Sequence, residues 1–192
     1  MALYEVTMTH SAESLERLSR MQYDLFCRRN RIARTAVSLA CVVFGMMRFS
    51  NWWGILLVAY GCYLITSTYS SANRTAHKII QQIRDSGMDF PSSVYRFEKA
   101  GLHVFSLPED ELISSLPYSE AAKLGEDSDY YYIFRDQYGG YMISKEQLGD
   151  ARSAFREFMV QKTGKFFESR RLSPLQKLLN ARRRRFDEPY HL

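Results

Sequence analysis

The 192-residue chain is poor in the residues that build disulfide frameworks and metal sites. It contains three cysteines, Cys27, Cys41 and Cys62, all in or beside apolar sequence. An odd number of such cysteines argues against a disulfide framework and favours free thiols in a reducing compartment. The four histidines are scattered along the sequence, at His10, His77, His103 and His191. None has a partner at the spacing of a zinc motif, so we expect neither a metal nor another cofactor.

Catalytic motifs are also lacking. Gly139-Gly140 is a turn signal and not a phosphate loop, because no helix start with a Lys-Ser or Lys-Thr pair follows it. The acidic run 109–111 follows Pro108 and is typical of a solvated turn. No secretory signal is visible, since the first apolar run begins after some thirty residues, many of them charged. These absences predict a protein that is not an enzyme.

Charge is unevenly distributed along the chain, whose net charge is +5. Residues 88–164 hold 8 basic and 13 acidic residues, a net charge of −5. Residues 165–192 hold 8 basic and 3 acidic residues, a net charge of +5. An acidic module flanked by basic segments is the arrangement expected where the flanks contact anionic lipid.

Two apolar runs, 32–49 and 52–69, are separated by a short connection. As a helix, each run of 18 residues would be about 27 Å long, close to the ~30 Å hydrocarbon thickness of a bilayer. Neither run has a polar face at helical period. We therefore expect a transmembrane hairpin of two antiparallel spans. The alternative is that the runs form core helices of a soluble bundle.

The residues that flank these runs favour the membrane interpretation. Basic residues gather before and at the start of the first run and follow the second, whereas Arg48, at the end of the first run, is the one basic residue near the connection. The positive-inside rule then places both termini in the cytoplasm of a two-span cell-membrane protein. We expect two kinds of site residue: interface anchors at Trp52 and Trp53, and membrane-surface contacts at Arg28, Arg29, Arg31, Arg34, Arg182, Arg183, Arg184 and Arg185.

The remaining sequence predicts an α+β architecture. Alternation over 4–9 predicts a strand, and Ser11 is the expected N-cap of a helix that leads to the first run. From Val94 the period changes to two, which predicts about six further strands, and Pro117 restricts one of them to an edge or a bend. An amphipathic helix follows and ends at Gly164. We expect about seven strands in one bent antiparallel sheet capped by this helix.

The segments RFEKAGL, LPYSEAAKLGEDSDYYYIF and GYMISKEQL, placed after two close apolar runs, resemble the YcxB-like membrane proteins. The resemblance covers roughly 1–162 and implies a soluble part with a pleckstrin-homology-like fold and no catalytic residues. The predicted segments are an N-terminal strand and helix at 1–31, a hairpin at 32–69, a connecting helix at 70–87, the YcxB-like domain at 88–164 and a basic amphipathic tail at 165–192.

The predicted function is that of a membrane-anchored, non-enzymatic module at the cytoplasmic face. Its net negative charge favours a protein partner over direct binding of acidic lipid headgroups by the module. The alternative is an accessory subunit of a membrane transporter or membrane enzyme. We expect the lipid bilayer as a partner and a homo-oligomer as an option. We do not expect nucleic acid, because the arginine run of the tail has no interleaved aromatic platform.

Overall fold

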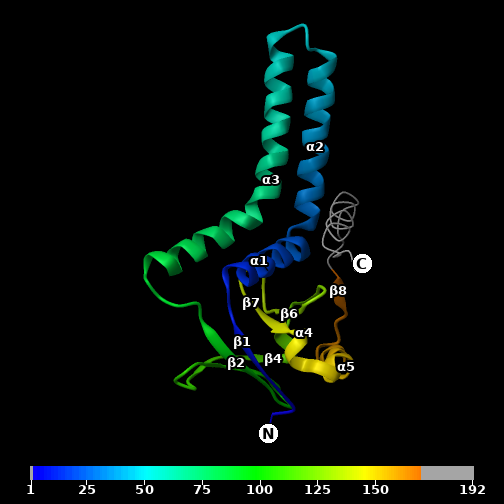
Figure 1. Cartoon of the computed structure of the whole chain (residues 1–192). Helices are drawn as coiled ribbons and strands as arrows, with labels where there is room; N and C mark the ends of the chain where they lie inside the picture. The colour runs from blue at the N-terminus through cyan, green and yellow to red at the C-terminus, as the bar shows by residue number, and fades with distance from the viewer. Residues whose placement is uncertain (1, 170–192) are drawn as a thin grey trace, which may run out of the picture.

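The computed structural model describes residues 2–169, with the side chains of 71–73 left out. Figure 1 shows a β-rich body from which two long helices, α2 (Arg28–Met47) and α3 (Trp52–Asp85), project as a hairpin. Most of the predicted tail at 165–192, including Arg182 to Arg185, lies outside the described residues. The described residues form an α+β structure with two four-stranded sheets.

The first sheet has the strand order β1-β2-β3-β4, with every neighbouring pair antiparallel. The predicted N-terminal strand is confirmed, because β1 pairs with β2 along its whole length. Its alternating pattern buries Val6 and Met8. The strands are β1 (Tyr4–Thr9), β2 (Ser92–Phe97), β3 (Gly101–Ser106) and β4 (Leu112–Pro117).

The second sheet has the order β7-β6-β5-β8. The predicted turn at Gly139-Gly140 is confirmed as the connection between β6 and β7, where the Asp136 carboxylate accepts the backbone N–H groups of Tyr138 and Gly139. β8 follows the helix α5 and pairs in parallel with β5. The strands are β5 (Lys123–Glu126), β6 (Tyr130–Phe134), β7 (Gly140–Ser144) and β8 (Phe167–Ser169).

The helix α5 (Arg152–Thr163) joins the two sheets. Its Phe155 ring is completely buried and lies 4.8 Å from the Phe97 ring of one sheet and 5.6 Å from the Tyr131 ring of the other. The short helix α4 (Lys145–Leu148) connects β7 to this region. The predicted stop of α5 is confirmed: Gly164 follows with a left-handed φ of 67°, which glycine adopts without strain.

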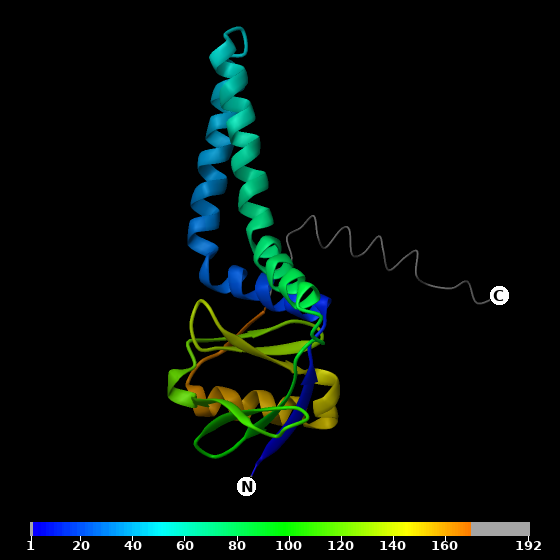
Figure 2. The same cartoon turned by 90° about the vertical axis from the view of Figure 1, so that its left-hand side faces the viewer.

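A helix layer separates the body from the hairpin. α1 (Ala12–Phe26) packs on the second sheet through the buried side chains of Met21 and Leu25. The Ser11 cap is confirmed, because the Ser11 and Ser14 hydroxyls each accept the other's backbone N–H. The lower part of α3 bends away from the hairpin and runs beside α1, as Figures 1 and 2 show.

Two predictions about the fold are wrong. The β region is not one bent antiparallel sheet closed by a helix: it forms two sheets, and a parallel strand follows the helix. A pleckstrin-homology-like fold is therefore not shown. The cause is non-local, because the pairing of β8 with β5 joins segments about 40 residues apart.

The prediction of two single-helix membrane spans at 32–49 and 52–69 is the second error. Within the described residues, no single helix is both long and apolar enough to cross a bilayer. In α2 the arginines occupy the first turns, which leaves an apolar stretch over 35–47 of only about 20 Å. α3 passes the same length and composition test only as a bent pair, Trp52–Ser70 and Arg74–Asp85, whose axes differ by 52°.

Candidate functional site

The hairpin helices approach each other through small residues. Ser38 is completely buried, and its hydroxyl donates to the Gly61 carbonyl oxygen at 2.5 Å. A Cβ atom at Gly61 would lie 2.6 Å from the Val42 Cγ2 atom, and one at Gly45 would lie 2.7 Å from the Gly54 carbonyl oxygen. Side chains are too large for these positions, so the helices pack in close backbone contact.

The outer surface of the hairpin is apolar on both helices. Phe44 of α2 is 56% exposed and Trp52 of α3 is 63% exposed. The exposed apolar side chains are Ile32, Val37, Leu39, Val43, Phe44, Met46, Met47, Phe49, Trp52, Trp53, Ile55, Leu56, Tyr60, Tyr63 and Tyr69. An exposed apolar surface of this extent marks a site where a protein contacts another protein or a membrane.

The tip of the hairpin combines apolar and aromatic groups with one charge. The rings of Trp52 and Trp53, the predicted interface anchors, lie 4.1 Å apart, and both are more than half exposed. Arg48 is exposed in the connection between the helices. Aromatic rings with a polar edge are enriched at the level of lipid headgroups.

The base of the hairpin is basic, and the structure brings together the four arginines that the sequence singled out there. Arg28, Arg29 and Arg34 are exposed on α2. Arg31 forms an ion pair with Asp24 of α1, and its guanidinium also lies 5.9 Å from the centre of the Tyr69 ring. The Asp24–Arg31 contact fixes the junction of α1 and α2, because it ties the two helices across the helix break at Cys27.

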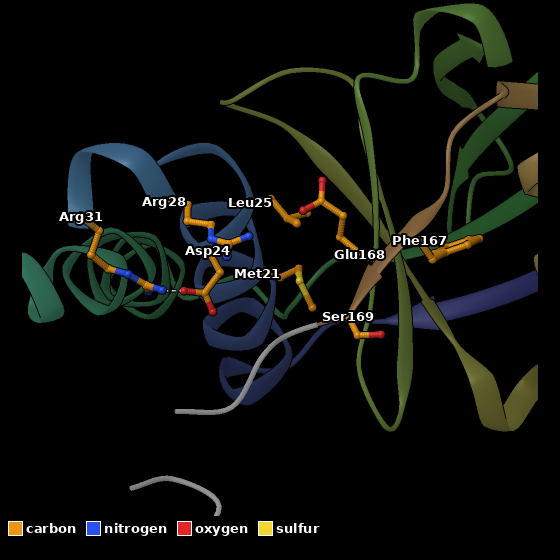
Figure 3. A pocket seen from close by; sticks show the side chains of 8 residues that line it. All are labelled: Met21, Asp24, Leu25, Arg28, Arg31, Phe167, Glu168 and Ser169. Carbon is orange, nitrogen blue, oxygen red and sulfur yellow. Dashed lines mark hydrogen bonds and ion pairs between the residues drawn. The ribbon is translucent and has the colours of Figure 1, made fainter. Parts of the chain in front are cut away.

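A cavity of about 360 Å³ opens beside this junction, between α1, the start of α2 and the strand β8. Figure 3 shows the Arg28 side chain above Asp24, with Glu168 across the cavity. An adjoining cavity of about 590 Å³ continues along the start of α2, where it is lined by Phe26, Arg29, Ile32 and Lys123. The two cavities share Leu25, Arg28 and Glu168.

Sequence reasoning missed three members of this region, namely Asp24, Lys123 and Glu168. Lys123 lies on β5, donates from Nζ to the Leu25 carbonyl oxygen at 2.8 Å, and lies 3.7 Å from the Glu168 carboxylate. Glu168 lies on β8, which reaches the site only through its pairing with β5. No local sequence signal points to these two residues, because long-range strand pairing brings them together.

His10 and Ser14 form the nearest approach to a catalytic pair in the described residues. The Ser14 hydroxyl lies 3.5 Å from His10 Nδ1 but donates to the Ser11 carbonyl oxygen at 3.0 Å. Burial lowers the pKa of His10 below its usual value. Because the serine proton is used in the helix cap, this pair is structural.

Within residues 2–169, no group of three or more His, Cys, Asp or Glu side chains could hold a metal ion. Of the acidic run that the sequence pointed to, Asp110 forms an ion pair with Arg96 at 3.1 Å. The described part of the chain therefore shows no constellation that supports acid–base or metal chemistry.

No protein-family model matches the chain, and no curated protein matches it. The YcxB-like resemblance therefore stays a prediction. Among solved structures, the chain has a weak similarity to human myosin 7b C-terminal MyTH4-FERM domain in complex with harmonin-a PDZ3 domain. The match has 11% identity and a TM-score of 0.29, and it covers 80% of this chain and 35% of that chain. At this level the similarity supports no conclusion about fold or function.

Proposed function

We propose that the protein is a membrane-attached, non-catalytic module: the α2–α3 hairpin inserts into a lipid bilayer, and the β-rich body lies at the membrane surface and binds a protein partner. The observation that carries this proposal is the apolar surface of the hairpin, which projects from the body and is exposed on both helices. In water this surface opposes solubility, whereas insertion removes it at roughly 25 cal/mol per Å² of apolar area.

The interior of the hairpin supports lipid as the occupant. The buried Ser38 hydroxyl donates to the Gly61 carbonyl oxygen, so these two polar groups at the helix contact are satisfied. Polar groups satisfied within the hairpin can enter hydrocarbon at low cost. Aromatic rings at the tip and arginines at the base match the polar boundaries of an inserted apolar segment.

Orientation follows from the same charges. The base carries Arg28, Arg29, Arg31 and Arg34 on α2, whereas the tip carries Arg48 alone. Basic residues are retained on the cytoplasmic side, so the body belongs on the cytoplasmic face. The hairpin inserts from that face, and neither helix acts as a separate span.

The two tryptophans of the chain are Trp52 and Trp53, so intrinsic fluorescence reports on the tip of the hairpin. We expect neutral phosphatidylcholine vesicles to shift this emission to the blue and brominated acyl chains to quench it. Two variants test which surface of the protein is responsible for vesicle binding. Leu39→Glu/Phe44→Glu/Leu56→Glu changes exposed hairpin residues, and Leu112→Glu/Ile113→Glu changes exposed residues of β4 in the body.

The hairpin variant should lose vesicle binding by at least about tenfold, because each charge at depth costs several kcal/mol on insertion. The body variant should bind as the unchanged protein does. The proposal would be contradicted if vesicles left the tryptophan emission unchanged and the protein sedimented as a stable oligomer. The apolar surface of the hairpin would then mediate contacts between copies of the chain.

A further inference from the structure

We propose that the cavity at the base of the hairpin seats the phosphate-bearing headgroup of an anionic phospholipid, held by Arg28 and Arg29 beside the Lys123–Glu168 pair. This inference rests on the proposed membrane insertion, because insertion places the base of the hairpin at the headgroup level. The net negative charge of residues 88–164 alone disfavours binding of an anionic lipid, but the basic side chains at the base of the hairpin provide a local site for one.

The first support is the state of the basic groups. Within residues 2–169, neither Arg28 nor Arg29 has a carboxylate partner, and both are exposed. Arg31, in contrast, forms an ion pair with Asp24, and Lys123 lies 3.7 Å from Glu168. The two acidic groups of the cavities are thus already opposed by other cations, and two guanidinium groups are left for a ligand.

The second support is the composition of the cavity walls. The two adjoining cavities are lined by four basic side chains, Arg28, Arg29, Arg31 and Lys123, and by two acidic ones, Asp24 and Glu168. The excess of two positive charges is enough to neutralise the single negative charge of a phosphodiester. Guanidinium groups bind phosphate oxygens through paired N–H donors, which favours arginine at such sites.

The third support is the apolar wall beside these charges. Phe26, Ile32 and Ala33 line the larger cavity, and Ile32 is 59% exposed at the start of the apolar hairpin surface. A ligand seated there meets cationic groups toward the body and hydrocarbon-compatible side chains toward the hairpin. A phospholipid has this arrangement of charge and acyl chain, whereas a free phosphate uses only the first half.

Lys123 gives the site a fixed element. Its ammonium group donates to the Leu25 carbonyl oxygen and lies 5.2 Å from the centre of the Phe26 ring. These contacts hold the charge in place at the end of α1, although Lys123 comes from β5. The site therefore depends on the folded body and is more than a basic stretch of one helix.

The test compares Arg28→Gln with Arg34→Gln. The two changes remove the same charge from the same helix, but only Arg28 lines the cavities. Binding of the full chain is measured on neutral phosphatidylcholine vesicles and on vesicles with equal parts of phosphatidylcholine and phosphatidylglycerol. We expect the unchanged protein to prefer the anionic vesicles by tenfold or more, and Arg28→Gln to lose most of this preference.

Arg34→Gln should retain most of the preference, and so should Lys99→Gln in the turn between β2 and β3, which lies at the end of the body away from the hairpin. Equal losses in Arg28→Gln and Arg34→Gln would overturn the seated site and show diffuse attraction to the surface. Full preference in Arg28→Gln would overturn it as well.

A competition arm separates the sources of the phosphate. Glycerol 3-phosphate at millimolar concentration should leave vesicle binding unchanged if the acyl chains contribute, and displacement by this soluble compound would overturn the lipid assignment in favour of a free phosphate ligand. Failure of the membrane proposal itself is distinguishable, because it abolishes binding to the neutral vesicles and the tryptophan shift there.

Discussion

Tyr132 is a completely buried side chain of the body, and its hydroxyl donates to Asp127 Oδ2 at 2.6 Å. Burial, followed by the hydrogen bond and the negative charge of Asp127, raises the pKa of Tyr132 well above its usual range. The same carboxylate accepts the backbone N–H groups of Asp129 and Tyr130 through its other oxygen. One aspartate therefore fixes a turn and a core hydroxyl together.

This arrangement predicts a loss of stability at alkaline pH. The folded pKa of Tyr132 lies above the unfolded value, so its contribution is fully present below about pH 10 and is lost as the pH rises further. Denaturant unfolding at a series of pH values should show the free energy of unfolding falling above about pH 10, and Tyr132→Phe should make this fall less steep.

At neutral pH, Tyr132→Phe should cost about 1 kcal/mol for the lost hydrogen bond. Tyr138→Phe is the control, because Tyr138 is 83% exposed and its change should leave the slope as it is. Tyr95 and Tyr118 are buried as well and also have raised pKa values, so part of the slope should remain. Identical slopes in Tyr132→Phe and the unchanged protein would contradict the prediction.

At the scale of elements, the contact between α2 and α3 determines whether the hairpin keeps its shape. We predict that Gly61→Leu destabilises it, because even a Cβ atom there would lie 2.9 Å from the Ser38 carbonyl oxygen. Overpacking of this kind typically costs about 1–3 kcal/mol. Thermal unfolding followed by circular dichroism on neutral vesicles measures the loss of helix.

The matched control is Ala40→Leu, which adds a larger side chain of the same kind to the outward surface of α2. It should leave the transition within about 0.5 kcal/mol of that of the unchanged protein, as is usual for surface positions. If Gly61→Leu and Ala40→Leu unfold alike, the close packing of the two helices does not support the hairpin.

Elements with a local signature were predictable from the sequence. Strand alternation at 4–9, the serine cap of α1, the Gly139-Gly140 turn and the glycine that ends α5 each depend on neighbouring residues, and each is confirmed. The division into two sheets and the strand β8 were missed, because they depend on pairing between distant segments. The short apolar stretch of α2 and the bend of α3 were also missed. The length of each apolar run was taken from the sequence alone, which does not show where the helices begin or bend.

The candidate site shows the same division. Arg28, Arg29, Arg31 and Arg34 were visible as a basic cluster before an apolar run, and the structure places them at the base of the hairpin. Their partners were not visible. Asp24 lies across a helix break from Arg31, and Lys123 and Glu168 arrive by strand pairing. The sequence could thus indicate where the basic residues cluster, but not which arginines form ion pairs with carboxylates.

At the scale of the whole molecule, the proposed insertion of the hairpin into a bilayer predicts which parts of the surface a protease can reach. Arg48 is exposed in the connection at the tip, and Arg135 is exposed at the end of β6 in the body. Without lipid, trypsin should cleave at both positions, since it cuts after exposed arginines. On vesicles added before the protease, cleavage at Arg48 should become at least about tenfold slower, because an inserted tip leaves the aqueous phase.

Cleavage at Arg135 should continue at its original rate in the same sample, and this separates insertion from general inhibition of the protease. The fragments produced by cleavage at the tip are identified by their absence from the digest of the Arg48→Gln variant. No other lysine or arginine lies between Arg34 and Arg74, so cleavage at the tip divides the chain into fragments of distinct size. If Arg48 is cut equally fast in protein that remains bound to vesicles, the hairpin lies on the membrane surface with its tip in water, and the arginines at its base then act as contacts for a helix that stays outside the hydrocarbon.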